Sequence, residues 1–126
     1  MEESLRYDTP VQFIGRMARE SFTYRGHRIE AGQVVLPYVG SANRDPAHFA
    51  EPDRFDILRK PNRHVALGQG PHMCIGANLV RIQTQLALQA LLTRMPDLRV
   101  APLPDKVWNT NLGFRGLQSL TVQTYH

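Results

Sequence analysis

The 126-residue sequence contains a single cysteine, Cys74. One cysteine cannot form a disulfide within the chain, so disulfide-stabilised secreted scaffolds are excluded and a reducing compartment is favoured. No apolar run approaches the roughly 18 residues that cross a bilayer, which argues against a membrane-spanning protein. Met1-Glu2-Glu3 does not have the character of a signal peptide either. The sequence therefore predicts a cytoplasmic location without membrane association.

Acidic residues are in the minority, with 11 Asp and Glu against 15 Lys and Arg and a formal net charge of +4. The basic residues are scattered along the chain, so the sequence predicts no nucleic-acid surface, whereas an acidic protein partner suits the charge. Hydrophobic residues make up 42% of the chain, enough for one small globular domain with a core. Because repeats and evident linkers are absent, residues 1–126 are interpreted as one unit.

The sequence does have a glycine-rich stretch directly before its longest helical pattern. Gly68, Gly70 and Gly76 carry no Cβ, so the backbone can turn tightly there and approach a flat ligand closely. Cys74 lies in this stretch, where the helix is expected to begin. Unpaired backbone N–H groups and the positive end of the helix dipole stabilise a thiolate at such a place. The environment suits a thiolate ligand.

The residues alone leave several interpretations of Cys74 open. A lone cysteine is usually a small buried hydrophobic residue without reactivity. A thiol nucleophile is an alternative, because a base could come from one of three histidines elsewhere in the chain: His27, His48 or His64. A zinc site is poorly supported, since His72 and Cys74 form only one ligand pair. The glycines also do not follow the G-x-G-x-x-G spacing of a nucleotide-binding loop.

The pattern Gly68-x-Gly70-x-His72-x-Cys74-x-Gly76 closely resembles the haem-binding loop of the cytochrome P450 family of haem-thiolate monooxygenases. Its five positions match at fixed spacing, and the departure is Leu67, where the family usually carries Phe beside the haem and its sulfur. The resemblance implies haem b (iron protoporphyrin IX) as cofactor, with Cys74 as the catalytic residue and the metal ligand. The haem-binding residues that it implies are Arg16, Leu67, Gly68, His72, Cys74 and Gly76.

Two further segments resemble family motifs. Glu3-x-x-Arg6 resembles the Glu-x-x-Arg motif that precedes the haem loop, where the pair is buried and locked by a third polar residue. By sequence alone, such a pair is most often a solvated surface contact. The segment 52–55 resembles the family's Pro-Glu-Arg-Phe, with Asp53 in place of the glutamate. The resemblance therefore implies a structural network of Glu3, Arg6 and Arg54, with Arg44 as a rival for the third position.

The resemblance also implies roles around the haem. Arg16 and His72 would bind the haem propionates, because a guanidinium fork suits a carboxylate. Arg81 would lie near the surface used by electron donors. The segment 10–13 would pass over the haem on the substrate side, and the turn at 112–117 would reach into the pocket. The substrate-pocket candidates are Val11, Phe13, Leu112 and Phe114, and for the first two a core role is an equal alternative.

The expected fold class is α+β: the C-terminal portion of the mainly α cytochrome P450 fold, with a small β-sheet, the haem loop and a long proximal helix. A helix is expected over 1–7, short strands between 11 and 36, a helical turn near 38–46 and a loop from there to 66. Leu79, Ile82, Leu86 and Ala90 recur at helical spacing and predict an amphipathic helix ending near Thr93. Short strands at 98–101 and 117–122 enclose a proline-rich loop with Trp108 as its anchor.

On this resemblance the function is that of a haem-thiolate monooxygenase. It would insert one oxygen atom from O2 into a small apolar organic substrate, with electrons from a ferredoxin or reductase. Nothing before Glu3 supplies the helix with an acid–alcohol pair of complete members, so the 126 residues alone are expected not to hydroxylate a substrate. They are also expected to expose apolar surface and to self-associate or bind a partner. The alternatives are a non-catalytic haem-binding remnant or module and a thiol enzyme.

Overall fold

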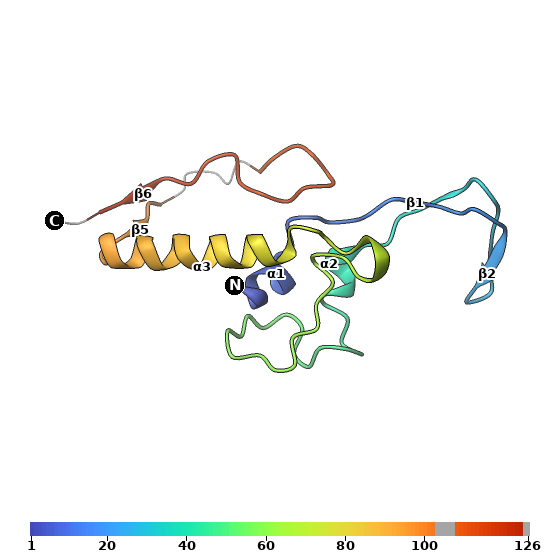
Figure 1. The fold of residues 1–126 in the computed structure, drawn as a ribbon, viewed down its shortest axis with the longest axis horizontal. Helices are drawn as coiled ribbons and strands as arrows, with labels where there is room; N and C mark the ends of the chain where they lie inside the picture. Colours follow the sequence, from blue (N-terminus) through green and yellow to red (C-terminus); the bar gives the residue numbers. More distant parts are fainter. Residues whose placement is uncertain (103–107, 125–126) are drawn as a thin grey trace.

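The computed structural model describes residues 1–102 and 108–124 and contains helices and short strands, as Figure 1 shows. This composition confirms the predicted α+β class. None of the described helices is long and apolar enough to cross a membrane. The helices are α1 (Glu2–Tyr7), α2 (Val39–Ala42), the 3-10 helix η1 (Gly70–His72) and α3 (Ala77–Arg94). The strands are β1 (Arg16–Met17), β2 (Phe22–Tyr24), β3 (His27–Ile29), β4 (Val34–Val35), β5 (Arg99–Val100) and β6 (Val122–Gln123).

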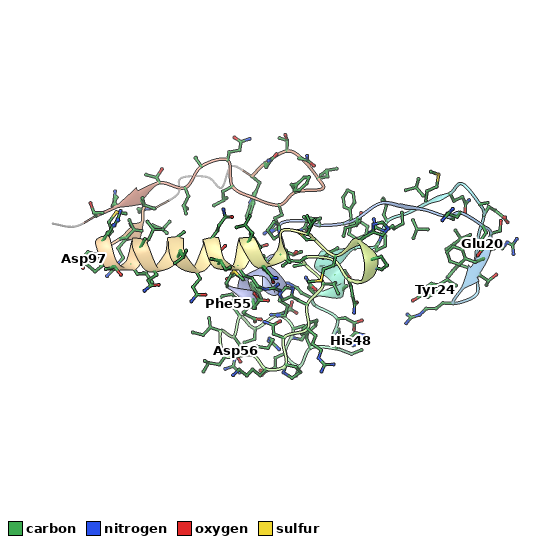
Figure 2. All side chains as sticks on the ribbon, viewed as in Figure 1. Glu20, Tyr24, His48, Phe55, Asp56 and Asp97 are labelled. Carbon is green, nitrogen blue, oxygen red and sulfur yellow. The ribbon has the colours of Figure 1, made fainter. Side chains whose placement is uncertain are left out.

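The first four strands form a narrow ribbon that projects from the rest of the chain (Figure 1). β1 pairs with β4 and β2 pairs with β3, both antiparallel, so the predicted small sheet is present as two two-stranded pieces. Arg25 and Gly26 connect β2 to β3 with φ angles of 48° and 81°, the positive values that a tight two-residue hairpin turn requires. Figure 2 shows Glu20 and Tyr24 in the outer part of this ribbon.

The predicted strand over 11–14 does not form a regular ladder. Val11 makes an isolated antiparallel bridge to Phe114, and Phe13 makes another to Tyr38. These two partners belong to segments far apart in the sequence, so each holds the backbone at one point and no continuous strand develops. The segment 11–13 therefore lies between the C-terminal turn and the start of α2.

α3 is the longest element and ends one residue after the predicted end at Thr93. The C-terminal segment returns along α3 (Figure 1), where β6 pairs with β5, although both strands are shorter than predicted. Trp108 bridges to Leu117, and its ring centroid lies 4.0 Å from the Arg115 guanidinium carbon. These contacts agree with the anchoring role predicted for Trp108. Residues 103–107 of the predicted proline-rich loop lie outside the described residues.

The interior of the described chain is largely polar. The largest fully buried side chains are Arg6, Asn43 and Thr9. The buried apolar residues are mostly alanine: Ala18, Val39, Phe49, Ala66, Ala77 and Ala101. The loop region 43–69 lies outside every helix and strand, so its buried backbone groups need side-chain partners. The Asn43 amide supplies one, because its Oδ1 accepts the Val65 N–H at 2.8 Å.

The apolar residues of α3 are exposed in the described chain. Leu79, Ile82 and Leu86 are 58%, 56% and 60% exposed, and Ala77 is the buried residue of this helix. The predicted exposure of apolar surface is therefore confirmed. A core face of α3, which its amphipathic pattern predicts, is not formed by the residues that the structure describes. Hydrogen bonds from Arg81 to Glu2 join α3 to α1.

Candidate functional site

The loop before α3 has a backbone shape that glycine adopts most easily. Gly68 and Gly70 have φ angles of 75° and 73°. A Cβ on Gly68 would also lie 3.3 Å from the His72 carbonyl oxygen, so a side chain there would crowd the loop. The Cys74 N–H donates to the Leu67 carbonyl at 2.8 Å and closes the turn. The glycine pattern therefore forms the tight loop that the sequence predicts.

Cys74 lies at the exit of this loop, two residues before Gly76 at the N-terminus of α3. Its side chain is exposed, and its sulfur has no hydrogen-bond partner among the described residues. The Ala77 N–H donates to the Cys74 carbonyl at 3.1 Å, so the first residue of α3 is bonded back to the cysteine. The predicted position at a helix start is correct, and the alternative of a buried cysteine is wrong. An exposed sulfur without a protein partner is open to an external ligand.

The chain's own side chains do not complete a metal site around this sulfur. Within residues 1–102 and 108–124, no group of three or more His, Cys, Asp or Glu could hold a metal ion. None of the histidines considered as a base is hydrogen-bonded to Cys74, and His64 is bonded to Glu2 instead. For the described residues, neither a protein-only zinc site nor a Cys–His dyad is supported.

A second, buried site connects α1 to the loop region. Arg6 Nε and Nη2 donate to the two carboxylate oxygens of Glu3, each at 2.8 Å, in a bidentate pair. The Arg6 side chain is 0% exposed. Its other N–H groups donate to three backbone carbonyls of the loop region, those of Asn43 at 2.9 Å, Pro52 at 2.8 Å and Arg54 at 3.1 Å. All donors of the guanidinium are used, and the predicted pair is buried.

The prediction that the Arg54 side chain completes this network is wrong. The Arg54 carbonyl faces Arg6, and the side chain points outward, where it is 63% exposed and pairs with Glu51 at 3.2 Å. The third side chain is Arg59, which is nearly buried and whose Nε donates to Glu3 at 3.2 Å. Arg59 lies in a loop without hydrophobic periodicity, so no spacing in the sequence marked it.

Two further groups surround the Glu3 carboxylate. The Asp56 backbone N–H donates to it at 2.8 Å, and Asn62 Nδ2 donates at 3.2 Å. Figure 2 places Asp56 in the loop region beside α1. The rival candidate Arg44 does not join this network, because its Nη2 donates to the Tyr7 carbonyl at 2.7 Å. The Glu3 carboxylate thus accepts hydrogen bonds from α1 and from three residues of the loop region.

The Glu3 carboxylate makes the stability of the fold depend on pH. The Arg6 guanidinium, helped by the Asp56 N–H and by Arg59, holds the pKa of Glu3 at about 2, below its ordinary value of 4.5. A depressed pKa means that the charged group stabilises the fold above about pH 4.5 and loses this effect as the pH falls through about 2. We expect protonation of Glu3 to lower the free energy of unfolding by about 3 kcal/mol as the pH falls from about 6 to about 2. Urea denaturation at each pH measures this change.

Glu3→Gln is the informative variant, because glutamine does not titrate. It should lose this part of the pH dependence of the unfolding free energy. Glu30→Gln is the matched control, since the Glu30 carboxylate pairs with Arg28 on the exposed ribbon. The control should keep most of the parent's acid dependence, because the Glu30 carboxylate is exposed. An identical dependence in the parent chain and in Glu3→Gln would contradict the assignment.

A third cluster joins α1 to α3 and was not foreseen from the sequence. Arg81 Nε and Nη2 donate to the two carboxylate oxygens of Glu2, each at 3.0 Å. His64 Nε2 lies 3.1 Å from Glu2 Oε2. The hydrogen-bonded Arg81 lowers the pKa of Glu2 below its ordinary value, and Glu2 in turn raises the pKa of Arg81. Glu2 and Arg81 are 79 positions apart, so no local pattern could have paired them.

The structure does not join the two predicted propionate ligands to each other. Arg16 lies in β1, as predicted, and its exposed side chain donates to the Gly15 carbonyl at 3.1 Å. His72 is the last residue of η1 and is exposed as well. Both side chains are therefore accessible to an added ligand, and their role toward propionates stays a prediction.

The predicted substrate-pocket residues come from two segments that lie side by side. The Gln12 N–H donates to the Gly113 carbonyl at 3.0 Å, next to the isolated bridge between 11 and 114. The residues from the first segment are half-buried and those from the C-terminal turn are exposed. The fold thus gathers all four candidates along one contact: Val11, Phe13, Leu112 and Phe114.

A family model described as Cytochrome P450 matches residues 1–113. The chain belongs to the cytochrome P450 family. The polyketide biosynthesis cytochrome P450 PksS of Bacillus subtilis (strain 168) is 47% identical over 124 residues, which cover 97% of this chain and 31% of the relative. The biotin biosynthesis cytochrome P450 of the same strain is 44% identical over 124 residues, with the same shares covered. The chain spans about a third of the length of these relatives.

Solved cytochrome P450 structures contain the same arrangement. The structure of Bacillus subtilis PksS has a TM-score of 0.93 and 46% identity, covering 99% of this chain and 33% of that one. P450BioI, solved in complex with an acyl carrier protein ligated to hexadec-9Z-enoic acid, has a TM-score of 0.92 and 42% identity, covering 98% of this chain and 32% of that one. The predicted family and the partial cytochrome P450 fold are confirmed. Cytochromes P450 are enzymes with a haem cofactor.

Proposed function

We propose that this cytochrome P450 chain is the haem-ligand part of a haem-thiolate monooxygenase and that Cys74 is the axial ligand of the iron. The main support is the state of Cys74, which is exposed, has no partner among the described residues and follows a closed loop at the start of α3. A soft, anionic sulfur is an established ligand of haem iron. The assignment of residues 1–126 to one C-terminal haem-ligand portion is part of this proposal.

The residues present fit a haem b group. Gly70 leaves the surface of the loop open, because a Cβ built there would meet nothing within 4 Å, so a flat macrocycle can approach the backbone. The hydrogen bond from the Cys74 N–H to the Leu67 carbonyl holds the backbone that carries the sulfur. When bound, the haem supplies the oxygen-activating chemistry. The other residues proposed to hold it are Arg16, Leu67, His72 and Gly76.

The proposed substrate is a small apolar organic molecule. Its support is the apolar character of the four pocket candidates and the ligands of similar proteins: CYP109E1 of Bacillus megaterium, 39% identical to this chain, is solved in complex with testosterone. Electrons would come from a ferredoxin or reductase, and the net charge of +4 suits an acidic donor. The single cysteine supports a cytoplasmic location. Self-association has no support from the comparisons and is not part of the proposal.

A haem titration of the chain tests the proposal. The reduced, haem-loaded chain under carbon monoxide should give the Soret band of a thiolate-ligated haem. An imidazole-type band, or no uptake of haem, would contradict the assignment. Product formation with a reductase and apolar substrates would then separate the monooxygenase from a second candidate, a haem-binding module without oxygenation. The exposure of Cys74 favours the second candidate for the isolated 126 residues, because oxygen activation needs a closed, dry site.

We expect Arg16→Ala to weaken haem binding about tenfold or more, since a charge-assisted hydrogen bond to a propionate is worth about 1.5 to 3 kcal/mol. The dissociation constant is measured by haem titration at low and high salt, and the loss should shrink at high salt. Arg19→Ala is the matched control, because Arg19 is an exposed arginine of the same ribbon. Equal affinities for Arg16→Ala and Arg19→Ala at both salt concentrations would remove Arg16 from the haem site.

A further inference from the structure

Both sides of the Cys74 loop are tied to one carboxylate, that of Glu2 on α1. On the exit side, Arg81 of α3 binds both Glu2 oxygens at 3.0 Å. On the entry side, the imidazole of His64 lies 3.1 Å from one of the same oxygens. Figure 1 shows α1 beside the beginning of α3, where these contacts occur. The Glu3 network, in contrast, is made with residues 43–62 of the loop region, and Glu2 is not part of it.

The covalent paths from these contacts to the cysteine are short. His64 stands three residues before Leu67, whose carbonyl accepts the Cys74 N–H at 2.8 Å. Arg81 stands four residues after Ala77, whose N–H donates to the Cys74 carbonyl at 3.1 Å. Movement of Glu2 would therefore be transmitted to the backbone on both sides of the sulfur.

The geometry of the cluster makes it stronger than an ordinary surface ion pair. The His64 side chain is only 3% exposed. Its Nδ1 accepts the Ala66 N–H at 3.3 Å, which leaves the ring proton on Nε2 to be donated to Glu2. The Arg81 contact is bidentate, although both of its partners are half-exposed. Bidentate geometry and membership of a network are the conditions under which such pairs contribute measurably to stability.

We propose that Glu2 is a positioning residue for Cys74: through His64 and Arg81 it fixes the two sides of the loop that presents the sulfur. The inference rests on the proposed function where it concerns haem, and on the fold alone where it concerns the loop. No substrate or iron atom is contacted by Glu2 in this role. Removing its charge should loosen the loop around Cys74 before it loosens the rest of the chain.

The haem-free chain gives the first test, by native-state hydrogen exchange of the Cys74 amide. Glu2→Gln should raise the exchange rate of this amide at least about threefold relative to the buried Ala18 amide, which is bonded to the Gln33 carbonyl in the distant ribbon. Glu30→Gln should leave the Cys74 rate unchanged, because its carboxylate also binds an arginine and a second side chain but lies in the ribbon. An equal rise at Cys74 and Ala18, or no rise, would overturn the proposal.

The haem-loaded chain gives the second test. Glu2→Gln and Arg81→Gln should each convert part of the thiolate-type Soret band of the reduced carbon monoxide complex into the band of a neutral thiol, whereas Glu30→Gln should not. The double variant should resemble Glu2→Gln, because Arg81→Gln removes only a contact that Glu2→Gln already removes. A parent chain without the thiolate-type band would defeat the proposed function and leave the exchange result to decide the role of Glu2. A normal band in parent and Glu2→Gln alike would defeat the positioning role only.

Discussion

Cys74→Ser should abolish the thiolate-type Soret band of the reduced carbon monoxide complex, the largest spectroscopic change expected from any single substitution in this chain. A serine hydroxyl is a hard, weakly acidic group and does not replace a soft thiolate on haem iron. Cys74 is the only cysteine, so no second thiolate can take its place. The measurement is the visible spectrum of the haem-loaded variant, reduced and under carbon monoxide, beside that of the parent chain.

His72→Gln is the matched control for this experiment, because His72 lies two residues before Cys74 in the same loop and its imidazole is the alternative ligand to be tested. This variant should keep the thiolate-type band and lose only haem affinity, in line with a role toward a propionate. The reverse result, a lost band in His72→Gln and a retained one in Cys74→Ser, would make the histidine the ligand. It would also remove the basis of the proposed function.

Arg6→Ala should lower the free energy of unfolding by about 3 to 5 kcal/mol, the range found when one partner is removed from a buried ion pair. The substitution leaves the Glu3 carboxylate buried and short of its bidentate partner. It also leaves the backbone carbonyls of Asn43 and Pro52 without their Arg6 donor, whereas the Arg54 carbonyl keeps the hydrogen bond from Arg59 Nη2 at 3.0 Å. Urea denaturation followed by circular dichroism gives the difference.

Arg54→Ala is the matched control, since it removes an arginine whose side chain makes only an exposed pair with Glu51. The change should lie within about 1 kcal/mol. If Arg6→Ala leaves too little folded protein to measure, Arg59→Ala removes one charged donor from Glu3 and should lower the free energy of unfolding by about 1 to 3 kcal/mol. Equal stabilities of Arg54→Ala and Arg59→Ala would show that the third side chain of the network is wrongly assigned.

Much of the secondary structure could be predicted from the sequence. α3 was expected from residues that recur at helical spacing, and its start follows from Gly76 and its neighbours. The β2–β3 hairpin was expected because Arg25 and Gly26 occupy a turn between β-type residues. The segment 11–14 has the same composition as a strand and forms only isolated bridges, because its pairing depends on segments about a hundred residues and about twenty-five residues further on.

Some residues of the candidate site could be predicted from the sequence, and others could not. The loop around Cys74 could be found because all of its determinants lie within ten residues, and a local pattern of glycines fixes a local backbone shape. Glu3 and Arg6 could be paired because they are three residues apart on one helix. Arg59 could not be assigned to Glu3, because the partners are 56 positions apart and the chain between them is irregular.

The sequence by itself determined the family, the place of Cys74 in the glycine loop and the α+β class, since each depends on short motifs or local periodicity. Only the tertiary structure decided which side chains surround the two glutamates of α1. Arg54 and Arg59 are chemically alike, and the direction of the loop backbone turned the carbonyl of the first and the guanidinium of the second toward the network. Glu2 and Glu3 are neighbours in sequence, yet the helix directs them to different sides, one toward the Cys74 loop and one toward the loop region. A carboxylate selects its partners by distance and direction in space, which the order of residues alone does not specify.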